Sequence, residues 1–404
     1  INTLSGVPSG TSGPTAILFA LALAFFNPAF ADVEDKQTTI EGTDEADNIL
    51  VDDPESAVAL SVTLEAEKAT AEASVVDAKD GDDSITTSAA SSSNATSAAG
   101  GANDPFDISL TDSDTVKVEP TAEASATGLK SGAGSDTIIT ADMVSADALA
   151  TGGAVAVGIV VGDTTDTERN VKTNLEANVT AKASAIGIEA DDDATEDSSE
   201  ETSPLGIDGL LVTYDKTVST VGGDDDLTLA DDITATANSA SGSAGVAVGA
   251  EVSGSATSSV KAEATSKATA VSTGAGSDRI TNVGSLSAAA GAAAGAINFT
   301  MEIANPSATG DPADKKKDKE DKSKSTTNVT AEAIATGIDA EGSGHSKTTS
   351  WSAGIEDNAI AVQWDVTESS IASADDVDNF GDITALSGAA SSADSAAITV
   401  GSAG

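Results

Sequence analysis

A five-residue pattern, Gly-x-Asp-x-(Ile/Leu), recurs along the chain at regular intervals. It occurs at Gly81–Ile85, Gly134–Ile138, Gly223–Leu227 and Gly276–Ile280, and a weaker copy without the glycine lies at Ser373–Val377. The intervals between successive aspartates of these copies are 53, 89, 53 and 97 residues. The chain is therefore expected to be a repeat protein with a super-period of about 142–150 residues.

The composition also favours stacked repeats. The chain has 66 acidic and 19 basic residues, no cysteine, one histidine and 2% aromatic residues. Its apolar fraction of 39% is mostly alanine, with valine and isoleucine. Alanine buries little area, so such a chain needs many similar small contacts or it stays disordered.

Strict alternation of small and polar residues argues against disorder. In the segments Ala122–Gly128, Ala181–Ile188 and Ala331–Ile338 every second residue is alanine, and each series ends in glycine. A half-buried strand requires this period, because successive side chains point to opposite faces. Interleaved Thr, Ser and Gly, with no 3.6-residue stripe, outweigh the intrinsic preference of alanine for helix.

We therefore predict an all-β fold, a β-solenoid whose Ala/Thr/Gly-rich strands stack coil upon coil. Four aliphatic residues of the motif, Ile85, Ile138, Leu227 and Ile280, should then point inward and form one column. The alternative is a sheet of long antiparallel hairpins with the Gly-Asp motifs at their tips. We disfavour it because blocks of about 20 residues exceed the usual strand length.

Residues 1–31 differ from the rest. An apolar run at Ala16–Phe26 is followed by Asn27–Ala31 and then by acidic residues, which is the pattern of a secretory signal and its cleavage site. This run predicts a short N-terminal helix. Residues 32–404 form the repetitive β region, with loop insertions expected near 191–203 and 311–325.

The charge restricts the class of partner. A net charge of −47 disfavours nucleic acid and anionic membrane surfaces, and it favours cations. Without cysteine the chain has no disulfides and no thiolate metal sites. We find no nucleophile elbow, no histidine cluster and no phosphate-binding loop before a helix, so we expect that the protein is not an enzyme.

The Asp motif resembles the nonapeptide of hemolysin-type (RTX) calcium-binding repeats. Residues Ser131–Ile139 and Thr273–Thr281 match its pattern G-G-x-G-x-D-x-U-x at all but the first glycine, and Gly42–Ile49 looks like a degenerate copy. The resemblance implies a secreted bacterial β-solenoid that binds calcium, with glycines that form the turn and aspartates that complete an oxygen cage. In that family the copies are in tandem, whereas here they stand about 50 residues apart.

The resemblance gives a set of candidate calcium ligands, since calcium takes six to eight oxygen ligands. The candidates are Asp47, Asp83, Gly134, Asp136, Asp225, Gly276, Asp278 and Asp375. The alternative is a plain Gly-Asp turn in which the aspartate caps its own backbone amides.

Two functions remain open. The first is a secreted bacterial structural protein of a surface layer, sheath, filament or matrix, stabilised by calcium. The second is a calcium-dependent adhesin, or an ice- or glycan-binding module built on Thr/Ser rows. The partners expected are calcium ions, further copies of the chain or cell-surface polysaccharide, with no stable insertion in a membrane once the signal is removed.

Overall fold

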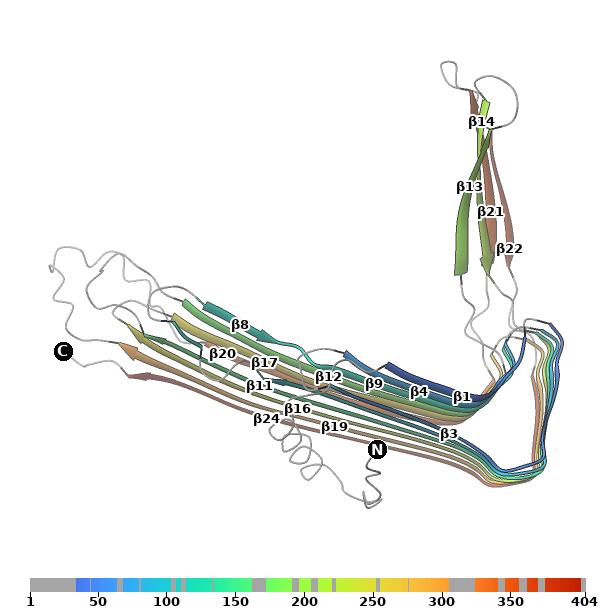
Figure 1. Ribbon diagram of the computed structural model, residues 1–404, viewed down its shortest axis with the longest axis horizontal. Coiled ribbons are helices and arrows are strands. Elements are labelled where there is room, and N and C mark those ends of the chain that lie inside the picture. Colours follow the sequence, from blue (N-terminus) through green and yellow to red (C-terminus); the bar gives the residue numbers. More distant parts are fainter. Residues whose placement is uncertain are drawn as a thin grey trace.

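The protein is a parallel β-solenoid, as the sequence predicts (Figure 1). The computed structural model describes residues 34–43, 45–63, 68–79, 81–102, 107–109, 114–132, 134–161, 172–190, 196–204, 210–219, 223–251, 255–274, 276–304, 324–340, 346–355, 362–369 and 375–400. The helix expected near the N-terminus lies outside these residues. Within them, no helix has the length and apolar character needed to cross a membrane.

Three parallel sheets run along the stack. Sheet A comprises β1 (Glu34–Glu41), β4 (Lys68–Asp77), β9 (Thr121–Lys130), β12 (Lys172–Glu189), β17 (Ser255–Ser272) and β20 (Lys324–Asp339), with β8 (Asp114–Val118) also paired to β12. Sheet B comprises β2 (Asn48–Val51), β5 (Ser84–Thr87), β10 (Thr137–Thr140), β15 (Asp226–Leu229), β18 (Arg279–Asn282) and β23 (Asp376–Asn379). Sheet C comprises β3 (Glu55–Thr63), β6 (Ser91–Ala102), β11 (Val144–Val161), β16 (Ile233–Glu251), β19 (Leu286–Ala304) and β24 (Ile383–Val400), with β7 (Asp107–Ser109) paired to β11.

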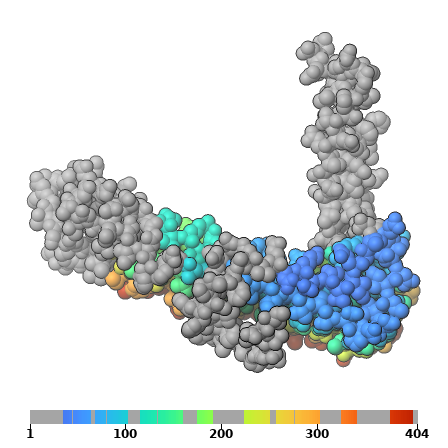
Figure 2. All heavy atoms as spheres, viewed as in Figure 1, coloured from blue at the N-terminus to red at the C-terminus, as the bar shows by residue number. Residues whose placement is uncertain are grey.

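Each coil passes through the three sheets in turn. Sheets A and C form two long layers, and the short strands of sheet B connect them at the right-hand end in Figure 1. In Figure 2 the first coils, coloured blue, face the viewer, and later coils show at their edges. The cross-section is therefore a flattened loop with one short side and two long arms.

The strands of the arms show that strand length does not distinguish a solenoid from a sheet of long hairpins. Several strands of sheets A and C, such as β12 and β16, have 18 or 19 residues. We disfavoured the hairpin sheet because such strands are unusually long, and that reason is wrong. A strand of this length is stable here because it pairs along its whole length with a neighbouring coil.

Small side chains fill the space between the two arms. Ala181, Ala183, Ala235 and Ala288 are buried, and alternate residues along the same strands face outward. In the far half of the arms, glycine on sheet C lies opposite larger residues on sheet A. A Cβ added to Gly245 would lie 2.5 Å from Val260 Cγ2 and 2.9 Å from Leu175 Cδ2. Small residues on one layer thus lie opposite larger residues on the other.

The repeating unit is one coil rather than the longer super-period. Asp83 and Asp136, which are 53 residues apart, occupy adjacent coils. The 89-residue step contains β13 (Glu196–Pro204) and β14 (Leu210–Ser219), and the 97-residue step contains β21 (Ser346–Ile355) and β22 (Val362–Ser369). The period of about 142–150 residues therefore spans two coils, one of which carries an insertion.

The inserted strands form a sheet of their own. β13, β14, β21 and β22 pair in that order as an antiparallel sheet, which stands apart from the coils in Figure 1. The insertion predicted near 191–203 thus contains a strand from residue 196. Of the loop predicted near 311–325, residues 311–323 lie outside the described residues, and Lys324 and Ser325 begin β20.

Candidate functional site

The aspartates of the repeated motif form one continuous column at the turn between sheets A and B. The backbone N–H of each aspartate donates a hydrogen bond to Oδ1 of the equivalent aspartate in the next coil. The bonds are Asp47 to Asp83 (2.7 Å), Asp83 to Asp136 (2.7 Å), Asp136 to Asp225 (2.8 Å), Asp225 to Asp278 (3.1 Å) and Asp278 to Asp375 (3.2 Å). The structure therefore brings all six predicted aspartates together.

The backbone carbonyl of each aspartate joins the coils a second time. The carbonyl oxygen of Asp83 accepts a hydrogen bond from the N–H of Thr137 at 2.8 Å, and that of Asp136 accepts from Asp226 at 2.8 Å. Every inner aspartate thus holds the following coil through one donor and one acceptor. The predicted alternative, an aspartate that caps its own turn, is seen at Asp47, whose Oδ2 accepts a hydrogen bond from the N–H of Thr43 at 2.6 Å. From Asp83 onward, Oδ1 of each aspartate caps the amide of a neighbouring coil.

The residue before each aspartate forms a second line of hydrogen bonds in the opposite direction. The N–H of Ser135 donates to Asp82 Oδ1 at 3.0 Å, that of Asp224 donates to Ser135 Oγ at 3.2 Å, and that of Ser277 donates to Asp224 Oδ1 at 2.8 Å. In this line the later coil donates to the earlier one. The two opposed lines fix the register of the coils at this corner.

The motif glycines provide clearance for this contact. A Cβ on Gly134 would clash with the carbonyl oxygen of Gly81, one on Gly223 with that of Gly134, and one on Gly276 with that of Gly223. Gly134 also has φ of 151°, a conformation that other residues rarely adopt. Gly134 and Gly276 were predicted as calcium ligands, and the structure gives both a steric reason to be glycine.

The aliphatic position of the motif forms the predicted inner column. Ile138 pairs in register with Ile85 and with Leu227, and Leu227 pairs with Ile280. All four side chains are fully buried. This column lies two residues after the aspartates, so each turn anchors its coil to the hydrophobic core.

Burial changes the acidity of the column. Asp83, Asp136, Asp225 and Asp278 are almost fully buried. Burial raises the pKa of Asp136 to about 6, and nearby aspartates, including Asp83, add to the rise. The pKa of Asp278 is raised for the same reason. A line of buried carboxyl groups at one-coil spacing favours protonation, or a cation that neutralises it.

The fit of calcium to this column can be judged from its oxygens. Oδ2 of Asp136 and of Asp278 is buried and accepts no hydrogen bond. The hydroxyls of Ser131 and Thr273 lie near enough to favour the charged carboxylates, although Ser131 donates its proton to the Ala190 carbonyl at 2.6 Å. One carboxylate oxygen per coil is far fewer than the six to eight that calcium takes.

Among the described residues, no group of three or more His, Cys, Asp or Glu side chains is placed to hold a metal ion. A calcium site at the column would need backbone carbonyls or water in addition to the aspartates. The calcium ligands stay a prediction.

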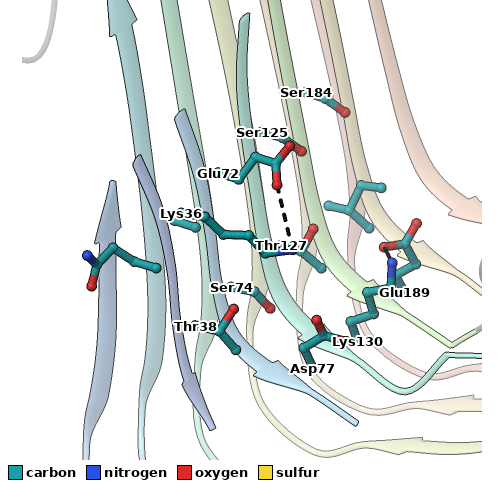
Figure 3. A pocket seen from close by; sticks show the side chains of 13 residues that line it. Lys36, Thr38, Glu72, Ser74, Asp77, Ser125, Thr127, Lys130, Ser184 and Glu189 are labelled. Carbon is teal, nitrogen blue, oxygen red and sulfur yellow. Dashed lines mark ion pairs between the residues drawn. The ribbon is translucent and has the colours of Figure 1, made fainter. Parts of the chain in front are cut away.

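A polar groove lies on the outer face of sheet A (Figure 3). Its volume is about 370 Å³, and hydroxyl groups from β1, β4, β9 and β12 line it, among them Thr38, Ser74 and Thr127. Its cations face carboxylates: Lys36 lies 3.8 Å from Glu72, and Lys130 lies 3.9 Å from Glu189. The groove can offer hydroxyl groups to a polar ligand, and sequence reasoning missed it because its residues come from four coils.

An asparagine pair was also missed. Asn282 Nδ2 donates to Asn379 Oδ1 of the next coil at 2.7 Å and to the Gly284 carbonyl at 3.0 Å. Both asparagines stand in an Asn-x-Gly pattern, at Asn282–Gly284 and Asn379–Gly381. A repeated pattern of this kind does not predict a hydrogen bond between the two side chains.

Comparison with known protein families, with characterised proteins and with solved structures finds no match.

Proposed function

We propose that the protein is a secreted bacterial structural component of a surface layer, sheath, filament or matrix. The observation that carries this proposal is the unbroken, in-register stack of six coils, which the buried aspartate column holds together. A stack of this kind is an extended, rigid element built from many equivalent contacts. Secretion is supported by the apolar run and cleavage pattern before residue 32.

The coil formed by β20, β23 and β24 has an open edge among the described residues. These strands each form the edge of their sheet, and Ile383, whose equivalents Leu286 and Ile233 are fully buried, is 45% exposed. An exposed edge is a template for another strand. Where no further coil of the same chain covers this edge, we expect coils of a second copy to continue the stack.

Electron microscopy of the purified chain tests this role. We expect filaments or sheets that lengthen with protein concentration. Ala385→Lys, on the exposed inner side of β24, should prevent growth, because a lysine there cannot be buried against a further coil. Thr330→Lys on the exposed outer side of β20 is the matched control and should assemble normally. Isolated particles at every concentration would refute the structural role.

The proposal includes calcium as the cation that neutralises the negative charge of the buried aspartate column. If it binds only the folded chain, it raises stability by RT ln(1 + [L]/Kd). We expect calcium to raise the thermal unfolding midpoint relative to EDTA, and the double variant Asp136→Asn/Asp278→Asn to lose this response. Unfolding curves that are identical with calcium and with EDTA would remove calcium from the proposal.

A glycan-binding adhesin is the second candidate, and one observation favours it. The chain has two Trp and one Tyr, and the register places all three in a single row across the inserted sheet: Tyr214 opposite Trp351, and Trp351 opposite Trp364. Aromatic residues suit the apolar faces of sugar rings, so their alignment in register favours this candidate.

Co-sedimentation with insoluble cell-wall polysaccharide tests the adhesin candidate. Trp351→Ala should abolish co-sedimentation, and Thr348→Ala on the same strand should leave it unchanged. Equal binding of polysaccharide by both variants would show that the aromatic row is not the binding site. The ice-binding alternative requires regular threonine rows, and the row through Thr236 contains Asp147, Ala289 and Leu386 instead.

A further inference from the structure

The two long arms present different outer faces to solvent. Every described strand of sheet A contains at least one lysine, whereas no described strand of sheet C contains lysine or arginine. Acidic residues are also sparse on the outer face of sheet C, where Asp147 and Asp394 are examples. The face of sheet A is therefore charged and that of sheet C is largely uncharged.

The outer face of sheet C is also apolar. Beyond a flat row of three glycines, Gly153, Gly242 and Gly295, the outward positions of β11, β16, β19 and β24 are aliphatic or aromatic, with the exception of Asp394. Two of these rows pair Val157 with Val246 and Phe299, and Ile159 with Val248, Met301 and Ile398. Ile297, Ile398 and, nearer sheet B, Leu149 are 62%, 44% and 38% exposed.

We propose that this face is an interface between two copies of the chain, which pack sheet C against sheet C about a two-fold axis. The apolar face is defined as the outward residues of β11, β16, β19 and β24 from the row of Leu149 to the row of Ile159. A two-fold interface uses the same patch on both subunits, so a single uncharged face is sufficient. This interface is distinct from the end of the stack, and it goes beyond the proposed function.

The area of the face is adequate for a dimer. Eleven residue positions along each strand at ~3.3 Å each, and four strands at ~4.8 Å each, give about 700 Å² on each copy. A standard stable interface buries about 800 Å² on each partner. Sheets also pack face to face about 10 Å apart, as the two layers of a β-sandwich do.

The distribution of charge favours sheet C as the face on which two copies meet. With a net charge of −47, two copies repel each other wherever their charged faces meet. Sheet C is the long face on which close approach brings few like charges together. The glycine row adds to the fit, because a flat surface lets the larger side chains of the partner approach closely.

Sedimentation of the full chain, as wild type and variants, tests the interface. Below the concentration at which filaments grow, the wild type should sediment as a two-copy species, and added salt should strengthen the dimer by screening the negative charge. Ile297→Lys and Ile398→Lys should each weaken dimerisation at least ~100-fold, because each places an unpaired charge in the interface.

Ile334→Lys is the matched control. Ile334 is 43% exposed on the outer face of sheet A, nearly the same as Ile398 on sheet C. It should leave the dimer intact, and circular dichroism should show the same strand content in all variants. Ala385→Lys, which blocks the end of the stack, should also retain the dimer.

A wild type that stays a single copy at high salt would overturn the interface, as would equal dimerisation by Ile398→Lys and Ile334→Lys. Loss of filaments with retention of the dimer would instead contradict only the proposed structural role.

Discussion

The corner of the solenoid and its arms are stabilised in different ways. At the corner, specific groups fix the coils: four of the six coils have a glycine at which a Cβ would clash with the preceding coil, and an aspartate holds the next coil at 2.7–3.2 Å. Along the arms, the interior is alanine repeated many times, and no single residue is decisive. The corner therefore sets the register, and the arms supply most of the buried area.

The largest effect should come from the corner glycine. Gly134→Ala places a methyl group against the Gly81 carbonyl and forces an unfavourable φ, so we expect a loss of more than ~3 kcal/mol in the free energy of unfolding. Gly153→Ala is the control, because an added Cβ there meets no atom within 4 Å. Urea denaturation measures both, and equal stability of the two variants would contradict the role of the corner.

Overpacking an arm should cost less. Ala235→Leu adds volume between two close-packed layers and should lower the free energy of unfolding by about 1–3 kcal/mol. Thr236→Leu adds a similar group on the outer side of the same strand and should change stability little. If the inner variant is as stable as the outer one, the space between the arms is not filled as described.

Two substitutions of Asp136 should separate the contribution of its hydrogen bond to stability from the contribution of its charge. Asp136→Ala leaves the N–H of Asp83 without an acceptor, which should cost about 1–2 kcal/mol. Asp136→Asn keeps an oxygen acceptor and removes a buried charge, so at pH 8 it should be at least as stable as the wild type. An asparagine variant weaker than the alanine variant would show that the charge itself is required.

The smallest expected effect is on the pH dependence of stability: the free energy of unfolding should fall as the pH rises from 5 to 8. The pKa of Asp136 rises from 3.8 to about 6 on folding, so the folded state binds the proton more tightly than the unfolded chain. Its stabilising contribution is fully present below pH 3.8 and is lost as the pH rises through 6. We expect the wild type, without added calcium, to be more stable at pH 5 than at pH 8 by on the order of 1 kcal/mol. Asp136→Asn should reduce this difference, and a wild type that gains stability from pH 5 to pH 8 would contradict it.

The sequence predicted the arms and the column, but not every role within the column. Alternation in Ala181–Ile188 identified strands because burial on one face imposes a period of two. The recurrence of Asp83, Asp136 and their equivalents identified one column, since parallel coils place equal positions side by side. The hydrogen bonds between aspartates could not be predicted, because each joins residues 36–97 positions apart.

The apolar face of sheet C had a visible sequence signal. In Ala154–Val161 the positions on both faces are apolar, so the alternation that marks a half-exposed strand is lost. Such a run predicts a strand covered on both sides. The signal was missed because the alternation of alanine with polar residues elsewhere was read as the rule for the whole chain.

Distances between labels on adjacent coils test the central claim, the stacking of the motif in register, most directly. Thr137 and Asp226 are register partners on the exposed side of sheet B, and Arg279 is one coil further. Because the chain has no cysteine, spin labels can be placed with the double variants Thr137→Cys/Asp226→Cys and Thr137→Cys/Arg279→Cys. Stacking in register places the labelled positions about 5 Å apart in the first pair, which predicts spin exchange, and about 10 Å apart in the second, which predicts weaker dipolar broadening. Spectra of isolated, non-interacting labels for both pairs would contradict it.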